Sequence, residues 1–540
     1  MAKSVTSERY GILSFIVAFA LRAVPEILLP KYPIGTDTIR YVAASLKYYQ
    51  APLSMKLSPL VIVTTLVTHS LQVSPFALYK VVTPTLYGLL ALSFFSFQRS
   101  FLRWGPKECL VGSLLLISQI SMLRTSWDLL NNELGLIFMF AAIAALAARN
   151  VKGRIFSSIL QVLAVMANGL VGMLMIITMF SHFLASKGST PLRGRHTIFL
   201  SVPALIAFII LFPLFPLVQV AIPQLATSPV TQIGVPDYSL LSTTDMLLLF
   251  LLCSWQVLLF AGVGVITRNS MADGMFMFLT AASIAPFVFD PGSVGSILLS
   301  ATRIGELALS FLLYYYRWMF MLSVPLTIYA VQGLRELGIT AKHMKGLLLI
   351  MLVFLGFSFS YASGLLPTKG LGTGAASLIS SGDVAHKSVT RIGDIVPGSM
   401  VRSSIETSKL DALVSNLEWV SGINASCLLT PIAVYGWAEI FTEKNHLILF
   451  PTIAQLDEAA KLSLDLCTGP TYLVWYSSVH LDGFTQVHSN GGMAVFVLDR
   501  GAIQGSIVNR VDFRNIQAIC RIIELDQPSR KQWFFIVSDI

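Results

Sequence analysis

Residues 10–30 read YGILSFIVAFALRAVPEILLP, a run long and apolar enough to cross a lipid bilayer as one helix. No small-residue cleavage site follows the run, so we expect a retained span and not a removed signal peptide. The whole chain has the same character: of its 540 residues 55% are hydrophobic and 12% charged, and the mean hydropathy is +0.73. A soluble domain carries about twice that charged fraction. The sequence therefore predicts an integral membrane protein.

Further apolar runs bring the prediction to about 11 helical spans. The other runs cover residues 76–98, 108–123, 134–148, 155–168, 170–186, 197–222, 246–267, 271–289, 307–333 and 346–365. The two runs that meet at Asn168 and Gly169 are either two spans or one long kinked helix. The segment 57–73 is apolar but short, and we assign it to an interfacial or re-entrant helix.

The distribution of Lys and Arg supports this count, because every predicted inner segment is basic when the N-terminus lies inside. The inner basic residues are Lys3, Arg9, Arg99, Arg103, Lys107, Arg149, Lys152, Arg154, Lys187, Arg193, Arg195, Arg268, Arg335, Lys342 and Lys345. Counting 57–73 as a span would invert all later loops and spoil the pattern. The same pattern accounts for the formal net charge of +9, so we expect no nucleic-acid partner.

The chain is expected to form a transmembrane domain over 1–365, a Gly/Ser-rich linker over 366–390 and an extracytoplasmic α/β domain over 391–540. In the last part the segments LILFPTI, TYLVWYSS and MAVFVLDR alternate as strands do, whereas DALVSNLEWVSGI and LDEAAKLSLDL have the period of helices. This part also holds three of the five cysteines, Cys427, Cys467 and Cys520, so at most one disulfide can form there. No cysteine spacing indicates a metal site.

Polar residues gather at the predicted outer side of the membrane, where charges within a span are costly and usually functional. The first outer loop, 31–56, holds Asp37 followed by an amphipathic helix, and it carries four basic residues on the side that should avoid them. One interpretation is an interfacial helix whose lysines extend to the membrane surface. The other is a site for an anionic headgroup, with Asp37 beside it as a base.

The second outer loop, MLRTSWDLLNNELGL, is short and polar between two apolar runs. Its polar residues are Arg124, Asp128, Asn131, Asn132 and Glu133. Arg124 and Asp128 lie one helical turn apart and could form a simple ion pair. Two carboxylates and two amides could equally hold a hard divalent cation such as Mg²⁺ or Mn²⁺ through oxygen ligands.

Three further arginines lie in or beside predicted spans. Arg22 and Glu26 have the spacing of an ion pair within one helix, which we take as structural. Arg303 precedes the tenth span, and Arg317 lies inside it without a carboxylate one turn away. A lipid phosphate would suit the guanidinium of Arg317, as would a carboxylate on another helix. Lys80 is expected to extend toward the membrane surface.

The order of these motifs resembles the GT-C glycosyltransferase superfamily, in particular its protein mannosyltransferase and aminoarabinose transferase-like branch. The matching motifs are P-x-G-T-D at Pro33–Asp37, Leu57-Ser58-Pro59-Leu60, R-x-x-W-D at Arg124–Asp128, and Arg317 followed by Pro325-Leu326. The chain departs from the oligosaccharyltransferase catalytic subunit, since it has no WWDYG-like motif and Asp128 is not part of a D-x-D. Transfer of a single sugar is therefore favoured.

The resemblance implies a donor sugar on a polyprenyl (dolichyl-type) phosphate and a protein or glycan acceptor on the extracytoplasmic side of the bilayer. Asp37 would take the proton from the acceptor hydroxyl or amide, and Asp128 would also be catalytic. The implied donor-phosphate residues are Arg124, Arg303, Arg317 and Lys56. Asn131, Asn132 and Tyr41 would contact the sugar or the acceptor, and Asp128 with Glu133 would hold the divalent cation.

Two other classes fit part of the sequence. A transporter or flippase for a lipid-linked or anionic substrate should show internal repeats and polar residues at the membrane midplane in broken helices. No repeat is evident, and the charges gather at the outer ends of the spans. A non-catalytic membrane subunit would keep the fold, but catalytically inactive relatives should have lost Asp37 or Asp128.

Overall fold

The protein is described here by a computed structural model. It describes residues 2–28, 31–33, 35–49, 51, 53–147, 150–185, 195–211, 231–232, 254–258, 260–267, 269–288, 318, 320–338, 344–362, 405, 409–423, 427–442, 446–450, 456–467, 469–479 and 481–500.

The chain divides into two compact units. The helical unit comprises Met1–Ile34, Ser54–Val218 and Ser242–Leu365, and the sheet unit comprises Gly35–Leu53, Gln219–Leu241 and Leu366–Ile540. The helix α2 (Thr36–Leu46) of the first predicted outer loop therefore groups with the C-terminal residues.

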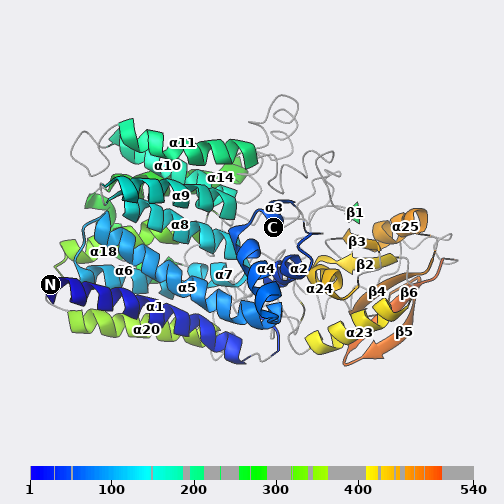
Figure 1. Ribbon diagram of the computed structural model, residues 1–540. Coiled ribbons are helices and arrows are strands. Elements are labelled where there is room, and N and C mark those ends of the chain that lie inside the picture. Colours follow the sequence, from blue (N-terminus) through cyan, green and yellow to red (C-terminus); the bar gives the residue numbers. More distant parts are fainter. Residues whose placement is uncertain are drawn as a thin grey trace. The chain divides into compact units, whose positions relative to one another are not determined.

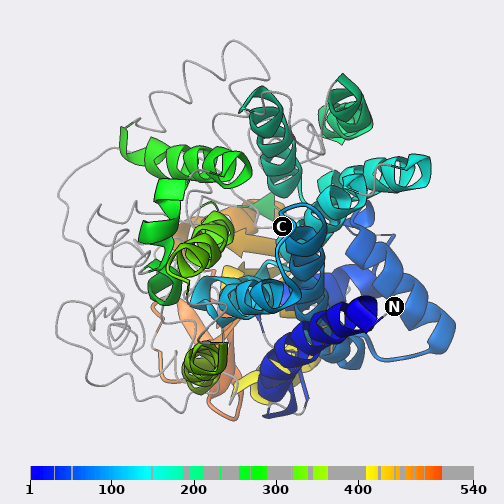
Figure 2. The ribbon, with the colours of Figure 1, turned by 90° about the vertical axis from the view of Figure 1, so that its left-hand side faces the viewer.

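The helical unit is built from long apolar helices packed side by side (Figure 1). Its helices are α1 (Ala2–Leu28), α4 (Pro59–Leu71), α5 (Pro75–Ser100), α6 (Pro106–Ser118), α7 (Ile120–Asp128), α8 (Leu130–Leu146), α9 (Val151–Ala167), α10 (Gly169–Ala185), α11 (Arg195–Leu211), α14 (Ser270–Val288), α18 (Ser323–Glu336) and α20 (Met344–Ala362). The short helix α3 (Leu53–Lys56) precedes α4. Helix α5 packs against both α1 and α8, and α9 packs against α8, α10 and α11. Figure 2 shows the helices in a view turned by 90° about the vertical axis.

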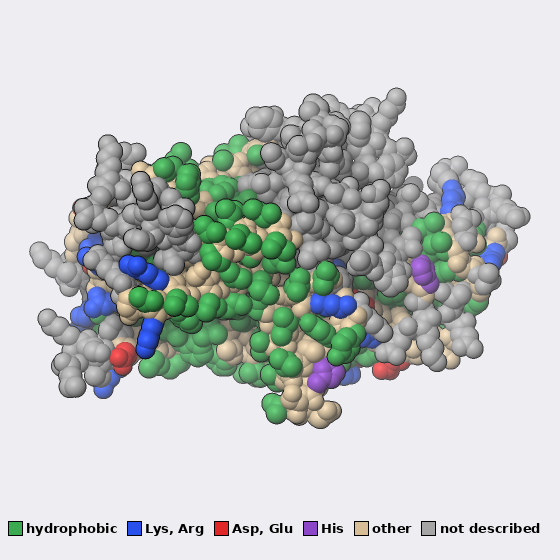
Figure 3. Space-filling model, turned by 45° about the horizontal axis from the view of Figure 1, so that its top comes forward, with side chains coloured by type: hydrophobic (Ala, Val, Ile, Leu, Met, Phe, Trp, Pro, Cys, Tyr) green, Lys and Arg blue, Asp and Glu red, His purple; other side chains and the backbone are tan. Residues whose placement is uncertain are grey.

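Several of these helices expose large apolar side chains, as expected of a surface that faces lipid. Ile16 of α1 is 54% exposed, Phe156 of α9 55% and Ile210 of α11 64%. Hydrophobic side chains also cover much of the described surface in Figure 3. Among the described residues, Glu8–Ile27 and Pro75–Ser100 are long and apolar enough to span a bilayer, and seven further apolar helices are shorter, at 10–17 residues. The count of 11 spans remains a prediction.

One predicted span is interrupted, and the alternative left open at Asn168 is decided. The run 108–123 was expected to be one span, but it bends by 68° between α6 and α7, because Gln119 has an extended backbone with φ −74° and ψ 134°. At Asn168 the side-chain Oδ1 accepts hydrogen bonds from the backbone N–H groups of Leu170 (3.0 Å) and Val171 (3.1 Å). Asn168 thus caps the start of α10, and the runs on either side of it are two helices.

The sheet unit has a mixed six-stranded sheet in the order β1-β3-β2-β4-β6-β5. The strands are β1 (Thr231–Gln232), β2 (Cys427–Pro431), β3 (His446–Phe450), β4 (Thr471–Tyr476), β5 (Phe484–Asn490) and β6 (Met493–Leu498), and the helices besides α2 are α23 (Leu410–Gly422), α24 (Ile432–Phe441) and α25 (Leu456–Leu466). β2 pairs in parallel with β3 and β4, whereas β6 runs antiparallel to β4 and β5.

The sequence pattern is confirmed for β3, β4, β6, α23 and α25. It missed β2 and α24, because residues 427–441 form one nearly continuous apolar run in which a buried strand and a buried helix look alike. It also missed β5, whose side chains are mostly exposed on both faces and therefore do not alternate.

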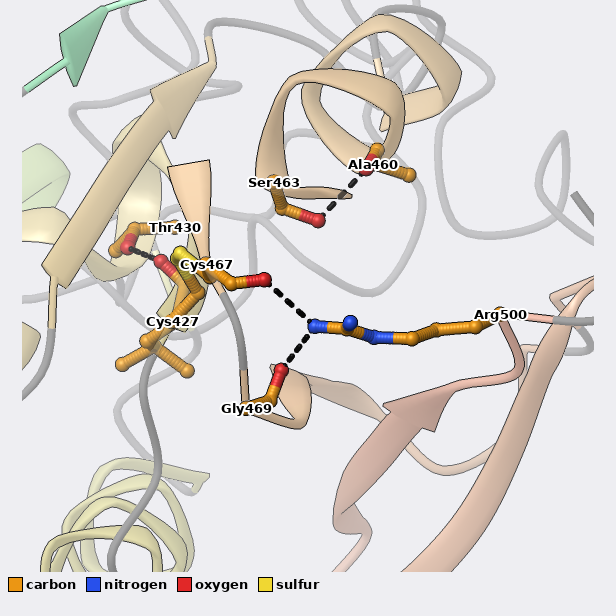
Figure 4. The surroundings of a disulfide bond; sticks show 8 residues. Cys427, Thr430, Ala460, Ser463, Cys467, Gly469 and Arg500 are labelled. Carbon is orange, nitrogen blue, oxygen red and sulfur yellow. Dashed lines mark hydrogen bonds between the residues drawn. A yellow bond between two sulfur atoms is a disulfide. The ribbon is translucent and has the colours of Figure 1, made fainter. Parts of the chain in front are cut away.

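A disulfide joins Cys427, at the start of β2, to Cys467, which follows α25 (Figure 4). The two Cα atoms are 6.1 Å apart, and 40 positions separate the residues in sequence. Arg500 binds the segment that contains Cys467, since its Nη2 donates to the carbonyl oxygens of Cys467 (2.8 Å) and Gly469. The pairing selects one of the three disulfides that the C-terminal cysteines allowed.

Loss of the disulfide should destabilise the sheet unit by about 3 to 4 kcal/mol, the loop-closure contribution for a loop of this length. Cys427→Ser, Cys467→Ser and the double variant should show the same loss, because each removes the same bond. Protease resistance of the full-length protein in detergent measures it. Reductant should lower the resistance of the wild type to that of Cys427→Ser and leave the variant unchanged; additive losses in the double variant would contradict the pairing.

Candidate functional site

Arg22 is the centre of a buried polar cluster in the helical unit, and its side chain is 0% exposed. Its Nη2 lies 2.7 Å from Glu26 Oε1 on the next turn of α1, which confirms the predicted ion pair. Its Nε donates to the carbonyl oxygen of Ser126 at 3.3 Å, and its guanidinium carbon lies 5.4 Å from the centroid of the Trp127 ring. Arg22 thereby binds the last turn of α7, where helix carbonyls lack intrahelical partners.

Two residues of helix α5 contact Glu26, the acidic member of the ion pair. Thr83 Oγ1 donates to Glu26 Oε1 at 3.3 Å, while Lys80 Nζ donates to the Glu26 carbonyl oxygen and lies 3.9 Å from Oε2. Lys80 is therefore directed at the cluster, with 18% of its side chain exposed, and not only toward the membrane surface as expected. The cluster joins α1, α5 and α7.

Glu133 is the most unusual group of the cluster. Its side chain is 0% exposed in the first turn of α8, and neither carboxylate oxygen has a hydrogen-bond partner among the described residues. Arg22 is close enough to attract it electrostatically. Burying an unpaired carboxylate is costly, so this group suits a proton, a cation or a hydrogen-bond donor supplied by a ligand.

The two asparagines beside Glu133 connect helices. Ser58 Oγ donates to Asn131 Oδ1 at 2.8 Å, which joins the Leu57–Leu60 motif to the second polar segment. Asn168 Nδ2 donates to Asn132 Oδ1 at 2.6 Å. Asn131 is 5% exposed and Asn132 is 2% exposed. The structure thus brings together sequence motifs that lie far apart in the chain.

A second set of polar contacts holds the start of α7. Gln119 Nε2 donates to Thr327 Oγ1 of α18 at 2.7 Å, and the hydroxyls of Ser121 and Ser323 form a hydrogen bond. Gln256 Nε2 donates to the Ser118 carbonyl at 2.9 Å. These side chains form hydrogen bonds with backbone and side-chain groups at the break between α6 and α7. Sequence reasoning missed them, because isolated Gln, Ser and Thr residues in apolar runs give no distinctive signal.

The first predicted outer loop is bound within the sheet unit. Asp37 lies half-buried in the first turn of α2, and Tyr41 is 3% exposed. The Arg40 guanidinium carbon lies 5.5 Å from the Tyr435 ring centroid, and Lys47 Nζ donates to the Glu439 carbonyl. Two of the four basic residues expected to meet lipid or an anionic headgroup thus contact α24.

Several predicted site residues lie outside what the structure describes. Arg303 and Arg317 are not described, and for Arg124 and Asp128 only the helical backbone of α7 is. Leu129 separates α7 from α8, so Asp128 and Asn132 lie on different helices. Lys56 is half-buried at the end of α3. Among the described residues no group of three or more His, Cys, Asp and Glu could hold a metal ion.

Removal of the Arg22 charge should be strongly destabilising, because it leaves a buried Glu26 carboxylate without its partner. We expect Arg22→Leu to cost about 3 to 5 kcal/mol and Arg22→Leu/Glu26→Leu to cost less than the sum of the single variants. Thermal unfolding in detergent measures both.

The pair Arg335–Glu108 is the matched control. Its shortest N–O distance is 3.3 Å, but its side chains are 42% and 23% exposed, so its loss should cost about 0 to 1 kcal/mol. An Arg22→Leu protein as stable as Arg335→Leu would show that the buried cluster does not stabilise the helical unit.

The sheet unit should lose stability as pH rises, through Glu439. Burial raises the pKa of its carboxyl, and the charges of Arg40 and Lys47 only partly oppose that shift. The folded state then binds more protons than the unfolded state between the ordinary pKa and the raised one, so the contribution is present at low pH and is lost across that interval.

Glu439→Gln should remove this dependence and increase protection of α24 at neutral pH. Amide hydrogen exchange of the full-length protein between pH 4 and 8, corrected for the intrinsic exchange rate, measures it. Glu418→Gln, on the exposed side of α23, is the control and should behave as wild type. Protection of α24 that rises with pH in the wild type would contradict the assignment.

No family model matches the sequence, and no curated protein matches it. Among solved structures the chain is similar to arabinofuranosyltransferase AftD from Mycobacteria in two cryo-EM structures. The match to a mutant form has a TM-score of 0.48 and 10% identity, and covers 89% of this chain and 41% of that one. The other has a TM-score of 0.42 and 12% identity, and covers 90% and 40%. The chain thus spans about two fifths of the length of these proteins.

Proposed function

We propose that the protein is a membrane glycosyltransferase that moves one sugar from a polyprenyl phosphate donor to an acceptor hydroxyl or amide outside the cytoplasm. The observation that carries the proposal is the fully buried Glu133 carboxylate, which has no hydrogen-bond partner among the described residues and lies near Arg22. It lies in the polar segment that, by the sequence resemblance, belongs to the transfer site. A group so costly to bury suggests a ligand-binding role.

The proposed reaction is a displacement at the anomeric carbon. Asp37 takes the proton from the acceptor as the acceptor oxygen or nitrogen bonds to that carbon, and the bond to the donor phosphate breaks. The leaving phosphate carries the negative charge. The cationic residues proposed to stabilise it are Arg124, Arg303, Arg317 and Lys56. Asn131, Asn132 and Tyr41 are proposed to lie beside the sugar or acceptor.

We further propose that the same segment binds a divalent cation. Glu133 offers two oxygens without described hydrogen-bond partners, and Asp128 ends the helix immediately before α8. Carboxylate oxygens are the ligands that Mg²⁺ and Mn²⁺ prefer. When bound, such an ion would neutralise charge on a phosphate.

The disulfide supports the proposed location of the C-terminal domain. Structural disulfides persist in oxidising compartments and are rare in the cytosol, so Cys427–Cys467 favours an extracytoplasmic position for the sheet unit. The charge pattern and the eleven predicted spans predict the same side for residues 366–540.

Transport of a lipid-linked substrate is a second candidate function, and the break at Gln119 favours it. A bent apolar helix with Gln and Ser side chains at the break is a feature of transporters. The two candidates differ in whether a new glycosidic bond forms.

The first test is transfer of radiolabelled sugar from polyprenyl phosphate donors in membranes that contain the full-length protein. We expect Asp37→Asn to lower the rate by at least about 100-fold, since the general base is lost. Glu133→Gln should also lower it, and chelation should do so if a cation is bound there. Asp411→Asn, an exposed carboxylate in the first turn of α23, is the control and should transfer normally.

The outcomes separate the candidates. Transfer that survives Asp37→Asn would assign the base to another residue. Movement of labelled lipid across the bilayer without any transfer, with every donor tested, would replace the enzyme by the transporter.

A further inference from the structure

Helix α2 is held along its length by α24 of the same unit. Its contacts with α24 include Arg40 over the Tyr435 ring and Lys47 on the Glu439 carbonyl. Arg40 lies within α2 and Lys47 follows its last residue, so the two anchors hold α2 near its middle and at its C-terminal end. The same helix buries Ile39 and Val42, at 1% and 0% exposed. α2 is therefore packed against α24 and is not a free surface helix of the sheet unit.

The two helices approach most closely at Gly436. A Cβ atom at this position would lie 3.2 Å from Arg40 Cγ, 3.2 Å from Ile39 Cγ2 and 3.5 Å from the Arg40 backbone nitrogen. A methyl group can be accepted if the Arg40 side chain moves by a few tenths of an ångström, but a branched side chain would meet the α2 backbone. Asp37 lies one helical turn before this contact, so the distance between α2 and α24 determines where Asp37 lies.

We propose that α24, through Gly436, is a positioning element that places Asp37 for proton abstraction. The C-terminal domain would then be part of the catalytic machinery and not only a site for the acceptor. This inference rests on the proposed function, because it takes Asp37 as the base.

Gly436→Val in the full-length protein tests the proposal. The larger side chain should displace α2, so kcat should fall by about 10- to 100-fold while the KM for the donor stays near that of the wild type. Gly436→Ala should recover most of the activity. Gly422→Val is the matched control, since a Cβ at this glycine of α23 would meet no atom within 4 Å. A normal kcat in Gly436→Val, with faster hydrogen exchange in α2, would overturn the proposal.

A cross-link tests the docking independently of folding defects in the valine variant. Ile39→Cys/Gly436→Cys should form a disulfide on mild oxidation, detected by mass spectrometry of peptides, whereas Ile39→Cys/Gly422→Cys should not. The oxidised Ile39→Cys/Gly436→Cys protein should be as active as the equally oxidised Ile39→Cys/Gly422→Cys protein, in which Cys427–Cys467 is also intact. Failure to cross-link, or a cross-linked protein much less active than this control, would overturn the proposal. A docked α2 without sugar transfer in the wild type would instead refute the proposed function.

Discussion

The helical unit depends on the contacts that the buried Arg22 guanidinium makes with α1 and α7. Burying an arginine charge away from water is costly unless an opposite charge or a hydrogen-bond acceptor compensates it. Glu26 supplies the charge, the Ser126 carbonyl accepts a hydrogen bond, and the Trp127 ring lies beside the guanidinium. These partners come from α1 and α7, and Lys80 and Thr83 add α5. One buried charge thereby fixes how three helices meet.

Helix α7 shows what this arrangement achieves. It has nine residues, too few for an isolated helix to be stable in water. It persists because Gln119 and Ser121 hold its start against α18, while Arg22 binds its last turn. The backbone of the R-x-x-W-D motif therefore belongs to a short helix that is held at both ends.

The sequence predicted what depends on local pattern. Apolar runs predicted most of the helices, the spacing of Arg22 and Glu26 predicted their ion pair, and short apolar segments rich in β-branched and aromatic residues predicted β4 and β6. The break at Gln119 was not predictable, since a single glutamine in an apolar run is compatible with a continuous span. Contacts between distant segments were equally hidden: Lys47 and Glu439 are 392 positions apart. The composition of α2 indicated an amphipathic helix but not what would cover it.

The docking of α2 resolves an anomaly in the charge distribution. The first predicted outer loop is rich in Lys and Arg, on the side of the membrane where the positive-inside rule expects few. Two of its cations have partners on α24, where Arg40 meets the Tyr435 ring and Lys47 meets a carbonyl oxygen. Glu439 nearby attracts both of them electrostatically. Their role in the folded protein is therefore contact with another element of the sheet unit, and a loop used in this way can carry positive charge without indicating the cytoplasmic side.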